Sequence, residues 1–283
     1  MFIDIHVFPA FYEPINGDPA KEELRHRALN IHKNGTAPLK HIFNQMNCAG
    51  LDRLCLLPQD YTSRTGSPLV TNDEIRTLVD LAPDHFIGFA SVDPNEKDAA
   101  DRLEDAFARL DLRGLYLHPG RQRFFPADPC AEPLYRICEQ YDRPVLFHAG
   151  FSYEPDTVTR YGHPLAFEEI AEQHPKLRIC VSQFGWPWFR DTAMLMLKYP
   201  NIYTDTACLY FDSASEFYKQ MLTQDVPITW IDRSLRHQIM FGSANPRFEQ
   251  IRMANSLSTL DFRDSTLDLI RGGNALAFLG RKF

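Results

Sequence analysis

The chain has 283 residues, of which 44% are hydrophobic and 24% are charged, with a formal net charge of −7. This composition is typical of a globular protein with a large core, and the negative charge argues against nucleic acid and anionic membranes as partners. No apolar run reaches the roughly 18 residues that a membrane helix needs. Asp4 and His6 interrupt the first apolar stretch, so we expect no signal peptide and a cytoplasmic location.

Six cysteines are scattered along the chain, and none forms a C-x-x-C pair. Several of them lie in apolar runs, such as Cys55 and Cys180. This distribution predicts reduced, buried thiols rather than disulfides or a zinc knuckle.

Short apolar runs recur along the chain, and each is followed by a loop and a helical stretch. The runs are continuous rather than alternating, which is typical of strands that are buried on both faces of a parallel sheet. The predicted strands lie within residues 1–6, 53–58, 85–92, 113–119, 143–150, 177–185, 201–207 and 237–243.

Helices are predicted in the connections at 37–50, 96–111, 165–175 and 191–200, from apolar residues at helical spacing or from a terminating proline. About eight βα units in a chain of this length predict a (β/α)8 TIM barrel. The alternative, a doubly wound sheet, would normally carry a G-x-G-x-x-G motif that is missing from this chain. We expect one domain over residues 1–283, with loop insertions at about 9–36 and 208–236.

Several polar residues fall at predicted strand ends, where the active site of a TIM barrel lies. Three histidines, His6, His118 and His148, end different strands, and three such histidines suggest a metal site or a site that descends from one. A structural role is the competing interpretation for each histidine taken alone.

A set of motifs in order carries a family resemblance: "IDIH", "HFIGFASVDP", "RGLYLHP", "RPVLFHAG", "NIYTDTA", "IMFGSANP" and "GGNALAFLG". On these motifs the chain resembles the amidohydrolase-related family of the amidohydrolase superfamily. That family includes metal-dependent hydrolases and enzymes of the aminocarboxymuconate-semialdehyde decarboxylase type. The resemblance implies a TIM barrel, a small carboxylate or aromatic substrate, one divalent metal, most often zinc, and frequent pairing as a homodimer.

The family pattern places metal ligands and catalytic groups at five positions, and this chain keeps two of them. His6 matches the first histidine of strand 1 and His148 matches the histidine of strand 5, so these two are the expected metal ligands. Phe8, Gln183 and Ala244 replace the other three. A catalytic zinc needs about three protein ligands, so the resemblance implies a metal site that is weakened or rebuilt.

Other residues at the same barrel end are candidates for catalysis and substrate binding. Without a metal, His148 and Asp205 could act as acid and base. The loops are also rich in aromatic residues and arginines, and an arginine binds a carboxylate through two parallel hydrogen bonds. We expect at least one of the arginines 121, 123, 190 and 247 at the barrel end. The expected substrate contacts are His118, Arg121, Gln183, Trp186, Asn245 and Arg247.

Two hypotheses follow from these residues. The first is a hydrolase or decarboxylase that acts on a small carboxylate or aromatic substrate. The second is a metal-free pseudoenzyme that keeps the barrel as a ligand-binding or partner-binding module.

Overall fold

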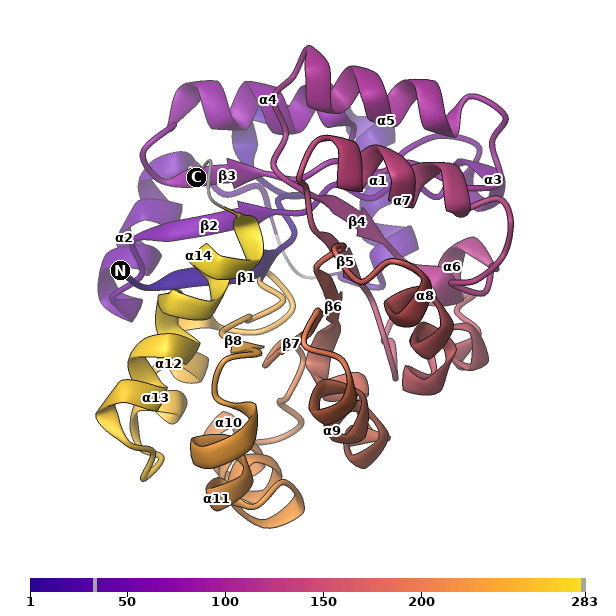
Figure 1. Cartoon of the computed structure of the whole chain (residues 1–283). Helices are drawn as coiled ribbons and strands as arrows, with labels where there is room; N and C mark the ends of the chain where they lie inside the picture. The colour runs from indigo at the N-terminus through magenta and orange to yellow at the C-terminus, as the bar shows by residue number, and fades with distance from the viewer. Residues whose placement is uncertain (33–34, 281–283) are drawn as a thin grey trace.

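Eight parallel strands form the centre of the protein. The computed structural model describes residues 1–32 and 35–280. Hydrogen bonding joins the strands in chain order, as the runs β1-β2-β3 and β4-β5-β6-β7-β8. Helices cover the outside of the strands, and β8 lies next to β1 (Figure 1). The strands are β1 (Ile3–Val7), β2 (Arg53–Leu56), β3 (Phe86–Gly88), β4 (Leu115–Leu117), β5 (Val145–Phe147), β6 (Ile179–Val181), β7 (Ile202–Asp205) and β8 (Ile239–Met240).

Backbone contacts close the two runs into a barrel. Between β3 and β4, Ala90 pairs with Leu115 in a parallel bridge. Between β8 and β1, the amide of Ile5 donates to the carbonyl of Phe241 at 3.0 Å, and the amide of Phe8 donates to the carbonyl of Asn245 at 2.8 Å. A closed barrel leaves no strand edge unpaired. The TIM barrel expected from the sequence is therefore confirmed.

The strand residues are buried on both faces, which explains their continuous apolar runs. Residues that point inward, such as Ile5, Cys55 and Leu146, form one apolar cluster. Residues that point outward, such as Leu54 and Val145, join a larger cluster between the strands and the helices. Phe278 also belongs to the inner cluster, and the centroid of its ring lies 5.2 Å from that of Tyr203.

The four predicted helices are present as α2 (Leu39–Ala49), α5 (Ala99–Ala108), α8 (Glu168–Gln173) and α9 (Phe189–Lys198). A capping box between Thr71 and Glu74 begins one of the further helices. The further α-helices that complete the connections are α3 (Thr62–Thr65), α4 (Asn72–Leu81), α6 (Pro119–Gln122), α7 (Glu132–Gln140), α12 (Gln250–Ser258), α13 (Asp264–Asp268) and α14 (Asn274–Leu279).

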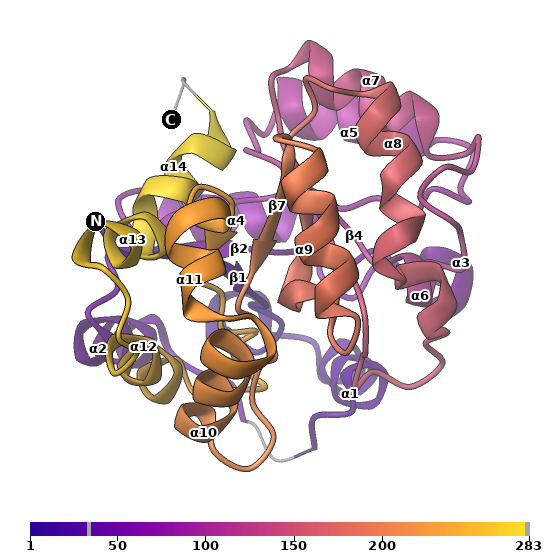
Figure 2. The ribbon, with the colours of Figure 1, turned by 60° about the horizontal axis from the view of Figure 1, so that its bottom comes forward.

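The two long segments expected as loop insertions contain helices. Segment 9–36 holds α1 (Pro19–Leu29), and segment 208–236 holds α10 (Ala214–Lys219) and α11 (Ile228–Trp230). Both α1 and α10 lie at the lower edge of the view in Figure 2. The fully buried Arg25 fastens α1 to the barrel, because its guanidinium donates to five oxygen atoms of neighbouring residues.

The sequence predicts reduced cysteines and no membrane-spanning helix. All six cysteines are free, and Cys55, Cys138 and Cys180 are buried. Within residues 1–32 and 35–280, no helix has the length and apolarity to span a membrane.

Candidate functional site

Five of the expected site residues meet at the mouth of the barrel, the end at which the strands finish. The imidazoles of His118 and His148 stack with their centroids 3.9 Å apart. The amide nitrogen of Gln183 lies 3.1 Å from Nε2 of His148. Nδ1 of His6 lies 2.9 Å from Oδ2 of Asp205. Parallel strands of a barrel end at one face, which is why residues so far apart in the sequence converge here.

Asp205 and His6 form a buried, hydrogen-bonded pair. Asp205 is fully buried and also accepts from the backbone amides of Gln183 at 2.7 Å and Ala207 at 3.0 Å. Because the carboxylate faces Nδ1 of His6, it favours the tautomer with the proton on that nitrogen. Nε2 of His6 is then a buried acceptor, and it has no hydrogen-bond partner among the described residues.

His148 and Gln183 are held by backbone carbonyls of the loop that follows β5. Nε2 of His148 lies 3.2 Å from the carbonyl oxygen of Phe151, and the side-chain amide of Gln183 donates to the same oxygen at 2.8 Å. Burial lowers the pKa of His148 to about 3, and the charge of His6 acts in the same direction. The imidazole of His148 is therefore neutral at physiological pH, and its Nε2 is engaged with the backbone.

These contacts decide whether a divalent metal fits. The pairing of His6 Nδ1 with Asp205 leaves Nε2 of His6 available as a ligand, whereas Nε2 of His148 faces a carbonyl. The ring of Phe8 lies against His6 at 5.0 Å between centroids, and Ala244 offers no side-chain donor. Among the described residues, no group of three or more His, Cys, Asp or Glu side chains could hold a metal ion. The residues present do not fit a resident divalent ion, so His6 and His148 lack the further ligands that the expected metal role requires.

His118 ends β4 and caps the short helix α6. Its Nδ1 accepts from the backbone amide of Arg121 at 3.2 Å, so the proton of the neutral ring is on Nε2. That nitrogen lies 3.5 Å from the hydroxyl of Ser152. Burial, followed by the neighbouring His148 and Arg121, holds the pKa of His118 well below its usual range. His118 is thus a neutral hydrogen-bond donor inside the mouth.

Arg121 is the most unusual residue of the site. Its side chain is only 4% exposed, yet Nε and Nη1 of its guanidinium have no hydrogen-bond partner in the described part of the chain. Its nearest stabilising contact is the ring of Tyr61, whose centroid lies 5.6 Å from Cζ. Buried charged groups are normally paired, because an unpaired one loses its hydration without compensation. The free N–H groups suit the oxygens of a carboxylate.

Glu154 belongs to the site although no motif or spacing marks it. Oε1 accepts from the amide of Gln59 at 3.2 Å, whereas Oε2 is buried, lies 4.0 Å from Nε2 of His118 and has no hydrogen-bond partner within residues 1–32 and 35–280. Burial raises the pKa of Glu154 to about 7, while Arg121 and Arg247 act in the opposite direction. Glu154 lies in an irregular loop, where no periodicity marks a residue as buried.

A small cavity opens beside Glu154 and His148. Its volume is about 30 Å³, and Phe8, His148, Glu154 and Arg247 are among the residues that line it. Arg247 lies over the ring of Tyr153, with Cζ 5.2 Å from the centroid. A volume of this size is about the share of one water molecule in the liquid, so a larger ligand needs the loop after β5 to move outward.

Two ion pairs hold that loop, residues 151–158, over the mouth. Asp156 accepts from Arg64 at 3.0 Å and from Arg123 at 2.7 Å. Arg64 lies in α3 and Arg123 follows α6, so the loop is tied to two neighbouring connections of the barrel.

The remaining expected residues lie outside the cavity. Trp186 packs at the rim against Phe151 and Phe211. The prediction that Asn245 contacts substrate is not supported, because its amide nitrogen faces the carbonyl of Phe248 at 3.3 Å and its backbone closes the barrel against β1. Arg190 is exposed at the surface. Of the four arginines considered, Arg121 and Arg247 reach the mouth, which meets the expectation of at least one.

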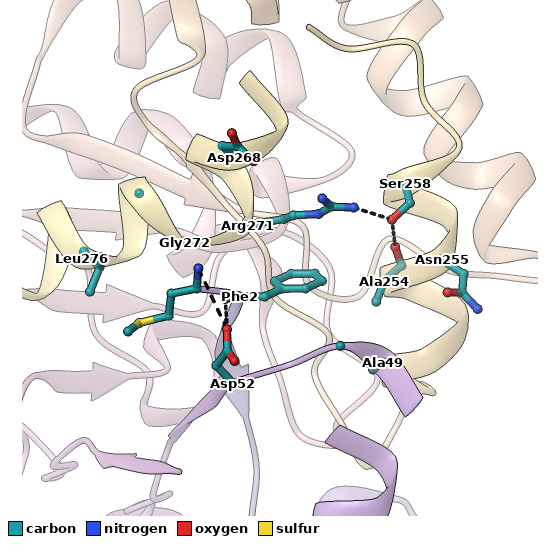
Figure 3. Close-up of a pocket in the computed structure, with 13 residues that line it drawn as sticks. Phe2, Ala49, Asp52, Ala254, Asn255, Ser258, Asp268, Arg271, Gly272 and Leu276 are labelled. Carbon is teal, nitrogen blue, oxygen red and sulfur yellow. Dashed lines mark hydrogen bonds and ion pairs between the residues drawn. The ribbon is translucent and has the colours of Figure 1, made fainter. Parts of the chain in front are cut away.

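A larger hollow, of about 760 Å³, lies at the opposite end of the barrel, where β1 begins (Figure 3). Several of its polar groups pair with one another. Arg271 donates to Ser258 at 2.9 Å, and the backbone amide of Phe2 donates to Asp52 at 2.6 Å. The amino end of a TIM barrel contributes to stability rather than to catalysis, so the mouth is the better candidate for the functional site.

Comparisons with known proteins agree with the barrel and its motifs. The amidohydrolase family profile matches residues 59–281. An uncharacterised TIM-barrel protein from Bordetella bronchiseptica is 21% identical, with a TM-score of 0.78 and 99% of each chain covered. The 5-carboxyvanillate decarboxylase LigW from Sphingomonas paucimobilis is 14% identical, with a TM-score of 0.66 and 98% of each chain covered.

A dihydroxybenzoic acid decarboxylase from Polaromonas, solved with bound manganese and the inhibitor 2-nitroresorcinol, is 16% identical, with a TM-score of 0.63. The superposition covers 98% of this chain and 96% of that one. None of the curated protein sequences that were compared matches this chain. The profile match spans most of the chain, and the protein is therefore a member of the amidohydrolase family.

Proposed function

We propose that this protein is an enzyme that binds a small, preferably aromatic, carboxylate at Arg121 and decarboxylates it; hydrolysis of such a compound is the alternative reaction. The observation that carries the proposal is the buried guanidinium of Arg121, whose Nε and Nη1 have no acceptor in the described part of the chain. A carboxylate would satisfy both donors and neutralise the buried charge.

Two further features support an aromatic carboxylate. The rim of the mouth carries the rings of Phe151, Trp186 and Phe211, which contact one another edge to face. Solved relatives in the same family are decarboxylases whose names specify aromatic carboxylates. A ring of that size requires the loop 151–158 to open, because the cavity holds about 30 Å³.

The chemistry in this proposal depends on side chains of the chain itself. Decarboxylation breaks a carbon–carbon bond, and the carbon that loses carbon dioxide must take up a proton in its place. Arg121 would orient the carboxylate, and the neutral His118 would donate a hydrogen bond from Nε2. No step is assigned to a metal, because the donors at the mouth do not fit one.

A second candidate function is a binding module without turnover. Phe8 and Ala244 stand at two positions where the family pattern has metal ligands, and this observation favours the second candidate. Under this alternative Arg121 still binds the carboxylate, but the ligand leaves unchanged.

One experiment separates the candidates. The wild-type protein and Arg121→Met are incubated with benzoate, 2,6-dihydroxybenzoate and 5-carboxyvanillate, while calorimetry measures binding and chromatography measures consumption. Consumption that Arg121→Met abolishes supports the enzyme, and Arg121-dependent binding without consumption supports the module. If none of the compounds binds, the carboxylate site is refuted. Arg136→Met is the matched control, because Arg136 is exposed and pairs with Glu132 on the outer surface.

A further inference from the structure

Glu154 lies near enough to Arg121 for the guanidinium charge to lower its pKa, and the mechanism above gives Glu154 no role. Resting on the proposed carboxylate site, we propose that Glu154 carries one proton whenever a ligand carboxylate is bound, so that the protein binds a carboxylate together with a proton. Glu154 would then be the group that presents an acidic proton to the ligand.

The side chains of Arg121 and Glu154 both lie near Tyr61. Cζ of Arg121 lies 5.6 Å from the centroid of the Tyr61 ring. Tyr61 packs edge to face on His118 at 5.7 Å, and Oε2 of Glu154 lies 4.0 Å from Nε2 of His118. The charges of Arg121 and Glu154 both act on Tyr61, and that of Arg121 acts on Glu154, so a carboxylate bonded to the free N–H groups of Arg121 would lie close to the carboxyl group of Glu154.

The side-chain environment of Glu154 supports a neutral acid. Its side chain is 9% exposed, and Oε2 is buried with no hydrogen-bond partner in the part of the chain that the structure describes. A carboxylate normally recruits several donors when it is buried, whereas a carboxylic acid needs an acceptor for its own proton. A ligand carboxylate would supply that acceptor.

The charged and titratable groups that face Glu154 come from every element packed against it. Arg121 and Arg247 carry positive charge, while His118 and His148 are neutral because of their lowered pKa values. The other titratable groups nearby are His6 of β1, Tyr61 of the loop after β2, Tyr116 of β4 and Cys208 after β7.

The single positive charge of Arg121 cannot fully neutralise the negative charges of two carboxylates. When a ligand carboxylate takes its N–H groups, Glu154 loses part of the attraction that opposes its protonation. Two carboxylates that share one site do not both ionise, because the charge of one raises the pKa of the other. The bound pair therefore titrates as one negative charge and one proton.

The test measures the protons taken up on binding. Formate, acetate and benzoate are titrated calorimetrically into wild type and Glu154→Gln, each in two buffers of different ionisation enthalpy, at pH 8 and at pH 5.5. The difference in heat between the buffers gives the number of protons. Wild type should take up close to one proton per ligand at pH 8 and close to none at pH 5.5, where Glu154 is already protonated.

Glu154→Gln should bind the same ligands through Arg121 but take up no proton at either pH. Binding to wild type without proton uptake at pH 8 overturns this inference and leaves the carboxylate site standing, and so does uptake that persists in Glu154→Gln. If neither protein binds any of the three ligands, the proposed carboxylate site fails and this inference fails with it. Nε2 of His6 is another buried acceptor without a partner among the described residues, so His6→Gln serves as the control that must retain the uptake.

Discussion

Replacing Arg121 with methionine should stabilise the free protein and weaken carboxylate binding. The guanidinium has two buried nitrogens without acceptors, and an unsatisfied buried donor costs about 1–3 kcal/mol. The cation–π contact of Arg121 with the Tyr61 ring offsets about 1–2 kcal/mol of this destabilisation. Methionine keeps the aliphatic packing and removes the unpaired charge. We therefore expect the free energy of unfolding, measured with urea, to rise by about 1–3 kcal/mol.

Binding should change in the opposite direction. A hydrogen bond to a charged group contributes about 1.5–3 kcal/mol, so benzoate should bind Arg121→Met roughly 10-fold to 150-fold more weakly. Arg25→Met is the matched control, because Arg25 is equally buried but donates to five oxygens. That variant should lose about 3–5 kcal/mol of stability. If Arg121→Met is destabilised to a similar extent, Arg121 is a structural residue and the reasoning is wrong.

Three other changes test the site. Asp205→Asn should lower the free energy of unfolding by about 2 kcal/mol, because it weakens the buried contact with His6. It should also abolish the fixed tautomer of His6, which ¹⁵N NMR spectra report. An unchanged His6 spectrum would contradict the pairing of these two residues. The raised pKa of Glu154 lets the folded state keep a proton that the unfolded chain releases above its ordinary value of 4.5. Stability should therefore fall by about 3 kcal/mol as the pH rises from 4.5 to 7, and a Glu154→Gln curve with the same slope would refute this. Chelator treatment should leave the melting temperature of wild type unchanged. In the double variant Phe8→His, Ala244→Asp, the melting temperature should rise on addition of Mn²⁺ or Zn²⁺. A fall in the melting temperature of wild type after chelation would show that the wild-type protein holds a metal.

The barrel could be predicted because its signal is local. Continuous apolar runs mark strands that are buried on both faces, and every predicted run overlaps an observed strand, although β1 extends one residue beyond its run. The grouping of His118 with His148 follows from the same topology, since the ends of β4 and β5 are neighbours. The replaced positions Phe8 and Ala244 could likewise be read from motif spacing alone.

The burial of Arg121 and Glu154 could not be read in this way. Arginine and glutamate are usually exposed, so a sequence by itself assigns both to the surface. Arg121 is buried because α6 is a single turn that folds back into the mouth after His118. Glu154 is buried because the ion pairs of Asp156 press its loop inward, and these partners are distant in the sequence. The direction of the Asn245 side chain depends in the same way on closure of the barrel, which no local pattern records.

The two ion pairs of Asp156 affect the rate at which a ligand is exchanged. At the proposed carboxylate site, a ligand that enters only when the loop 151–158 lifts would have a residence time set by the frequency of loop opening as well as by its own contacts. Arg64 and Asp156 are partly exposed to solvent, so dissolved salt screens their attraction. Exchange of a bound carboxylate should accordingly become faster as the ionic strength rises, and the protein would hold its ligand longest in dilute buffer.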